Sequence, residues 1–183
     1  DTTFLKNFSL LNITSLLNRV MNFVFVIFLV RTISQQDFGV YTLIWAHMGI
    51  LQSWQDLGTT SFGILQSEEK NKRALLNNVF MLRTLFAIFV SIGTIILAFL
   101  FRYPPTVIGA IAALTIIYFS NAITGFFMII SSLAKELITS SVVGFSINLL
   151  RTIGGIFVLY YSHSVYTFLY FAAFVYGVHG LTA

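Results

Sequence analysis

The chain contains no cysteine and few charged residues, with 9% of its 183 positions occupied by Asp, Glu, Lys or Arg. Without cysteine it forms neither disulfides nor thiolate metal sites. Soluble domains carry about 25% charged residues, so this chain has too few of them to cover a surface that faces water. Because 57% of its residues are hydrophobic, the composition indicates an integral membrane protein.

Sequence signatures of several functional classes are also missing. The net charge is +4, but the basic residues are scattered except in EEKNKR (68–73), which is too short and too acidic to follow a nucleic-acid backbone. No histidines or acids have metal-ligand spacing, and no glycine-rich phosphate loop ends in Lys-Ser or Lys-Thr. No nucleophile and base stand together. We therefore expect no nucleic-acid partner, no metal or other cofactor, and no enzymatic activity.

Six apolar segments are long enough to cross a bilayer, because a spanning helix needs about 20 residues at 1.5 Å each. No segment has the alternating polarity of a strand. Pro104 and Pro105 end the third helix, while Gly154 and Gly155 predict close helix packing within the fifth. We expect an all-α transmembrane six-helix bundle. We expect its spans to cover about 8–33, 38–65, 74–101, 106–131, 137–161 and 165–183, with the last cut before its end.

The charges near the span ends predict the orientation of the bundle. Two basic residues, Arg31 and Arg102, fall on the side opposite the amino terminus. Five fall on the same side as the amino terminus: Lys6, Lys70, Lys72, Arg73 and Lys135. Cytoplasmic loops carry the excess of Lys and Arg, so we expect a multi-pass protein of the cytoplasmic membrane with its amino terminus in the cytoplasm.

Four charged residues lie deep inside the predicted spans: Arg19, Asp56, Arg83 and Arg151. Counting 1.5 Å per residue places all four about 14–21 Å from the cytoplasmic ends of their helices. Such residues are costly in a bilayer and usually face a bundle interior or a watery cavity. We expect polar stripes on three spans to line a hydrophilic lumen with them. The stripes contain Asn12, Ser15 and Asn22 in the first span, Gln52 and Thr59 in the second, and Ser141 and Asn148 in the fifth.

The charges at this depth do not balance, since three arginines face one aspartate. A positive cavity predicts an anionic substrate, and a guanidinium matches phosphate or carboxylate oxygens in a bidentate manner. We expect Arg19, Arg83 and Arg151 to bind this anion, with Asp56 as a charge partner. The alternative for Arg19 and Asp56 is a buried ion pair that only locks two helices together.

The first 65 residues resemble a known family of exporters. A Lys-Asn pair precedes the first helix, VRTISQQDFGVY crosses the first turn, and LQSWQDLG lies late in the second span. In this order and spacing they resemble the Wzx-type lipid-linked oligosaccharide flippases of the multidrug/oligosaccharidyl-lipid/polysaccharide exporter superfamily. Two positions depart from the usual pattern. Ile33-Ser34 replaces Leu-Gly, and LQSEE stands where an arginine often follows the second helix.

The resemblance implies that the chain is the amino-terminal lobe of an exporter with 12–14 helices and alternating access. Its substrate would be an undecaprenyl-pyrophosphate-linked oligosaccharide unit, flipped across the cytoplasmic membrane for O-antigen, capsule or exopolysaccharide biosynthesis. The polysaccharide polymerase machinery would be a partner, beside the lipid bilayer. The arginines would attract the pyrophosphate, and the polar stripes would bond sugar hydroxyls.

Three alternatives stay open at this point. A peptidoglycan precursor flippase has the same anionic chemistry, and a multidrug or cation antiporter of the same superfamily has the same helix architecture. An antiporter would need more intramembrane acids than Asp56. A membrane scaffold without transport would use its buried charges to pair helices, so that Arg83 and Arg151 would each contact a carboxylate or main-chain carbonyls.

Overall fold

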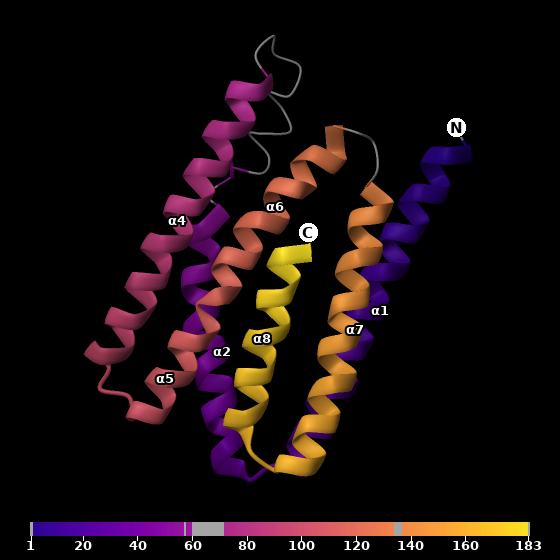
Figure 1. Cartoon of the computed structure of the whole chain (residues 1–183). Coiled ribbons are helices and arrows are strands. Elements are labelled where there is room, and N and C mark those ends of the chain that lie inside the picture. The colour runs from indigo at the N-terminus through magenta and orange to yellow at the C-terminus, as the bar shows by residue number, and fades with distance from the viewer. Residues whose placement is uncertain (1, 57, 60–71, 134–136, 183) are drawn as a thin grey trace.

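The protein is a bundle of antiparallel helices (Figure 1). A computed structural model describes residues 2–56, 58–59, 72–133 and 137–182, with side chains over 12–55, 58–59, 75–131 and 142–181. All of the regular structure in these ranges is helical, which confirms the predicted all-α class. The helices are α1 (Thr2–Thr32), α2 (Gln35–Asp56), α4 (Lys72–Leu100), α5 (Pro105–Leu114), α6 (Ile116–Leu133), α7 (Leu137–Ser162) and α8 (Val165–Thr182).

Within the described residues a helix lies in each of the six predicted spans, and positions 60–65 at the end of the second predicted span fall outside those residues. The fourth span differs from the expectation because it is made of α5 and α6, which are separated at Thr115. The N–H of Thr115 donates to the carbonyls of Ile111 and Ala112, and its hydroxyl also bonds to Ala112, 2.7 Å away. This local tightening interrupts the α-helical ladder without ending the apolar segment.

Length and composition support membrane crossing by four helical segments within the described residues, so the chain is a membrane protein. Large apolar side chains such as Phe23, Phe89 and Phe174 are exposed on the outside, as contact with lipid requires. The shorter α8 is also apolar. The four spans are Asn12–Thr32, Leu75–Leu100, Pro105–Ser131 and Val142–Ser162.

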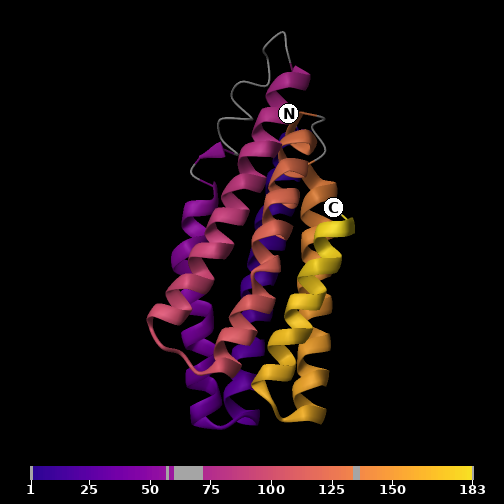
Figure 2. The ribbon, with the colours of Figure 1, turned by 60° about the vertical axis from the view of Figure 1, so that its left-hand side comes forward.

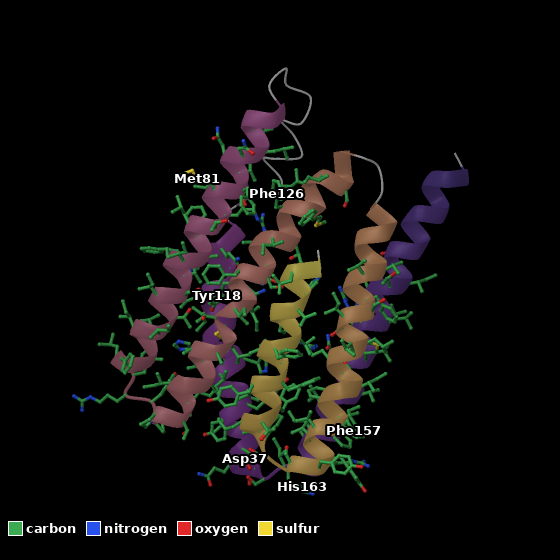
Figure 3. The ribbon with its side chains drawn as sticks, in the orientation of Figure 1. Asp37, Met81, Tyr118, Phe126, Phe157 and His163 are labelled. Carbon is green, nitrogen blue, oxygen red and sulfur yellow. The ribbon has the colours of Figure 1, made fainter. Side chains whose placement is uncertain are left out.

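Helix α2 is too polar to be counted among the four apolar spans, although its 22 residues are long enough to cover about 33 Å. Its polar side chains bond inside the bundle. His47 Nε2 lies 3.0 Å from the Thr94 carbonyl, and the Tyr118 hydroxyl donates to the Met48 carbonyl at 3.0 Å. Gln55 bonds to the Tyr118 carbonyl. Figure 3 shows Tyr118 between the helices rather than on the outer face. These bonds join α2 to α4 and α6.

The helices alternate in direction, so their connections gather at two ends of the bundle (Figures 1 and 2). The first turns of α1, α4 and α7 and the last turns of α2 and α6 lie at one end. The α1–α2, α4–α5 and α7–α8 connections lie at the other end, which places Arg31 and Arg102 there together. Which end is cytoplasmic stays a prediction from loop charge.

Neighbours along the chain are not always neighbours in the bundle. Helix α1 packs chiefly against α7 and makes few contacts with α2, while α8 lies between α6 and α7. The glycine pair of α7 permits the close approach of α8. A Cβ at Gly154 would stand 2.4 Å from Cζ of Phe171, and one at Gly155 would stand 2.7 Å from Cε2 of Phe168. The predicted packing role of these glycines is confirmed.

Candidate functional site

Arg151 lies midway along α7 and joins three helices. Its Nη1 donates to the Tyr176 hydroxyl of α8 at 2.7 Å. Its Nη2 donates to Oδ1 of Asn22 on α1 at 2.7 Å and to Oδ1 of Asn148 on α7 at 2.8 Å. The guanidinium carbon is also 5.8 Å from the centre of the Tyr176 ring, within the range of a cation–π contact.

A second amide extends this network along α1. Asn148 Nδ2 donates to Asn18 Oδ1 at 2.7 Å. Residues four positions apart share a helix face, so Asn18 and Asn22 both turn toward α7. Asn148 thus accepts a bond from Arg151 through its oxygen and gives one to α1 through its nitrogen. The orientation of the amide is fixed by these two bonds.

The acceptors of Arg151 are all neutral. Three of its five N–H groups have partners among the described residues, and these partners are two amide oxygens and one phenol oxygen. Asp37 is the acid whose side chain is described, and it is bonded to Ser34 at the α1–α2 turn, at the end of the bundle (Figure 3). Within the described part of the chain, the positive charge of Arg151 has no carboxylate partner.

The network faces a pocket of about 300 Å³, within the range of small-molecule sites. A second pocket, of about 430 Å³, adjoins it through Asn18, Asn22 and Gly144. Arg19 lines this second pocket, so the two arginines lie on neighbouring parts of one polar surface. The first is lined by Asn18, Asn22, Gly144, Ile147, Asn148, Arg151, Tyr176 and His179. The second is lined by Thr14, Ser15, Asn18, Arg19, Asn22, Gly144 and Phe145.

The structure therefore brings together five of the predicted residues on α1 and α7. They are Ser15, Arg19, Asn22, Asn148 and Arg151. Two members of the hydrogen-bond network around Arg151, Asn18 and Tyr176, were not among the predicted residues. The four-residue spacing between Asn18 and Asn22 could have identified the first of them. Tyr176 gave no such signal, because it is one of several aromatic residues in an apolar helix.

Arg83 lies elsewhere, between α4 and α6, and is 5% exposed. Its Nε donates to the Ala122 carbonyl at 3.2 Å and its Nη2 to the Asn121 carbonyl at 3.2 Å. Its Nη1 donates to the Thr59 hydroxyl at 3.1 Å. Arg83 lines neither of the two pockets, and its main-chain contacts are those expected of a residue that pairs helices.

The remaining predicted residues lie outside this surface. Asn12 is exposed on α1 and Gln52 on α2, and neither lines the two pockets. Thr59 is buried against Arg83. The side chains of Asp56 and Ser141 lie outside the described residues, so the predicted pair of Arg19 with Asp56 stays a prediction. Over the described ranges, no cluster of three or more His, Asp or Glu could hold a metal.

Comparisons of the chain with protein-family models, with curated proteins and with solved structures gave no match.

Proposed function

We propose that the protein is a lobe of a transporter that carries an anionic, lipid-linked oligosaccharide between the two leaflets of the cytoplasmic membrane. The observation that carries this proposal is the Arg151 guanidinium, held midway along α7 by neutral oxygens, with two N–H groups that bond to no described residue. The resemblance of the first 65 residues to Wzx-type flippases supports the substrate class. An undecaprenyl-pyrophosphate-linked unit for polysaccharide biosynthesis fits both the positive charge of Arg151 and the resemblance.

The depth of Arg151 makes an anionic ligand favourable. An arginine near the centre of a spanning helix costs about 2.5–3.5 kcal/mol by insertion scales. Neutral amides and a phenol solvate the guanidinium but leave its net charge in place. A phosphate oxygen would neutralise that charge through charge-assisted bonds, which are about twice as strong as neutral ones. The amides of Asn18 and Asn22 would remain close enough to bond sugar hydroxyls.

The exposure of Arg19 supports a partner lobe beside α1. Arg19 is exposed halfway along this helix and bonds to no residue in the ranges that the structure describes. A guanidinium that faces hydrocarbon is costly, and intramembrane charges normally face protein or water. A second lobe packed opposite α1 and α7 would enclose the two pockets in a water-filled cavity. This is the arrangement that alternating access requires.

The proposal is tested by measuring transport and headgroup binding in parallel. The complete transporter is reconstituted in vesicles with a fluorescent pyrophosphate-linked oligosaccharide lipid, and inorganic pyrophosphate is titrated into the detergent-solubilised protein. We expect Arg151→Ala to lower the transport rate and the affinity for pyrophosphate by about 10-fold to 100-fold. The reason is that a bond to a charged group contributes about 1.5–3 kcal/mol. Arg151→Lys should recover part of the loss, since it restores the charge but not the planar fork.

Arg31→Ala is the matched control, because this residue is exposed in the last turn of the same helix that bears Arg19. It should transport as the unmodified protein does. Full transport by both Arg151→Ala and Arg19→Ala would refute the proposal. Transport of a cationic dye in place of the lipid would favour an antiporter, and a preference for a peptidoglycan-type headgroup would favour the cell-wall precursor flippase.

A further inference from the structure

An apolar groove lies beside the arginine pocket, between α6 and α8, with a volume of about 400 Å³. One residue, Tyr176, lines both the groove and the arginine pocket. Its hydroxyl accepts the bond from Arg151. The groove is lined by Ile116, Phe119, Ser120, Ile123, Phe174, Tyr176, Gly177, Val178, Gly180 and Leu181. Polar and apolar spaces therefore meet at a single residue.

Small residues bring the two walls of the groove close together at its floor. A Cβ at Gly177 would stand 3.0 Å from Cδ1 of Ile116, and one at Gly180 would stand 3.2 Å from the Cα of Ser120. The hydroxyl of Ser120 is buried and has no hydrogen-bond partner, although a helical serine can bond to the preceding turn. The Ser120 hydroxyl is thus enclosed at the close contact between α6 and α8, and the accessible lining of the groove is mainly apolar.

We propose that the α6–α8 groove holds the hydrocarbon chain of the anionic lipid whose phosphate binds at Arg151. This inference rests on the proposed function and adds a tail site to it. In a lipid pyrophosphate the charged head and the apolar chain meet at the linking oxygen. In the protein the polar arginine pocket and the apolar groove meet at Tyr176. The phenol is suited to this junction, because its ring is apolar and its hydroxyl is polar.

The volume of the groove sets the length of chain that it can hold. A methylene group is about as large as a water molecule, whose share of liquid volume is about 30 Å³. The groove therefore accepts roughly a dozen carbon atoms, and the rest of a longer chain would lie in the bilayer. Binding should strengthen with chain length up to about this limit and then level off.

The first experiment uses the unmodified protein in an uncharged detergent, with binding to micelles alone subtracted. The ligands are inorganic pyrophosphate, then geranyl, farnesyl and geranylgeranyl pyrophosphate, and finally farnesol, which lacks the charged head. We expect farnesyl pyrophosphate to bind at least 10-fold more tightly than inorganic pyrophosphate. Geranylgeranyl pyrophosphate should gain little more. Equal affinity for inorganic and farnesyl pyrophosphate would overturn the tail site.

The second experiment fills the groove with Val178→Trp. Its control is Val24→Trp on α1, which replaces another exposed valine that lines none of the three pockets described above. We expect Val178→Trp to lower the affinity for farnesyl pyrophosphate toward that for inorganic pyrophosphate, which should itself be unchanged. The control should alter neither affinity. An unchanged ratio of the two affinities in Val178→Trp would overturn the tail site.

Failure of the tail site and failure of the proposed function give different results. Arg151→Ala should weaken both ligands, because it removes the charge that they share. If Arg151→Ala leaves the affinity for inorganic pyrophosphate unchanged, the headgroup site and the proposed function fail. If it weakens inorganic pyrophosphate while chain length has no effect in the unmodified protein, the headgroup site stands and the groove does not bind the tail.

Discussion

Gly125 on α6 offers a direct test of how Arg83 is held. An alanine Cβ at this position would stand 1.9 Å from Nη2 of Arg83, 2.4 Å from Cζ and 3.1 Å from Nε. These distances are far inside van der Waals contact, so Gly125→Ala must displace the guanidinium or move α6 away from α4. Because the guanidinium bonds to the carbonyls of Asn121 and Ala122 on this helix, displacement breaks both bonds.

The expected loss of stability follows from those two bonds. Bonds to charged groups contribute about 1.5–3 kcal/mol each, so losing both costs about 3–6 kcal/mol. The replacement of a helical glycine by alanine returns up to about 1 kcal/mol. The net loss of about 2–5 kcal/mol should lower the Tm by at least about 4 °C, since 1 kcal/mol shifts the Tm of a domain of this size by about 2–4 °C.

The assay is thermal unfolding of the purified protein in detergent, followed by circular dichroism at one scan rate. Gly93→Ala on α4 is the matched control, because a Cβ there meets no atom within 4 Å. It should leave the Tm unchanged or raise it. Arg83→Ala alone should also be destabilising, since it removes the charge-assisted bonds from the guanidinium to the two carbonyls of α6.

A double-mutant cycle identifies the cause. In the Arg83→Ala background the clash is gone, so Gly125→Ala should cost nothing further and the two effects should be far from additive. The reasoning is refuted if Gly125→Ala is tolerated as well as Gly93→Ala, or if it costs the same with and without the arginine.

Two further predictions concern the connections and the packing of the helices. The Ser34 hydroxyl accepts a bond from the Asp37 N–H at 3.1 Å and donates to the Asp37 carboxylate at 2.8 Å, so Ser34→Ala should cost about 0.5–2 kcal/mol of helix capping, while Ser34→Thr should retain the cap. A Tm for Ser34→Ala no lower than that for Ser34→Thr would contradict this. Gly154→Ala should lower the Tm relative to Gly49→Ala. The added Cβ at Gly154 would meet the Phe171 ring at 2.4 Å, whereas a Cβ at Gly49 meets nothing within 4 Å. Equal Tm values would contradict this and show that the ring moves aside without loss of stability.

The polar surface on α1 and α7 could largely be predicted, because helical spacing fixes which residues share a face. The pattern predicts that Asn22, Asn148 and Arg151 face a polar space, and in the structure they form one hydrogen-bond network. Arg83 was grouped with them on depth alone. Rise per residue gives the height of a side chain in the membrane, but it does not give the direction in which its helix faces or which helix lies opposite.

The role of Tyr176 could not be predicted for a related reason. Its helix is apolar on all sides, so no periodic pattern distinguishes the face that meets Arg151. The contact forms because α8 lies between α6 and α7, and the glycines of α7 let it approach closely. Such a contact depends on residues far apart in the chain, and their pairing is a property of the whole bundle.

The amino-acid pattern alone establishes a helical membrane protein, the approximate positions of its apolar helices and the faces that are polar. Those properties follow from local hydrophobicity and from the 3.6-residue period of the α-helix. Only the tertiary structure decided that α1 pairs with α7, that Arg83 bonds to the main chain of α6, and that Arg151 meets α1 and α8. Many pairings of similar apolar helices satisfy the same pattern, and close packing of particular side chains selects among them.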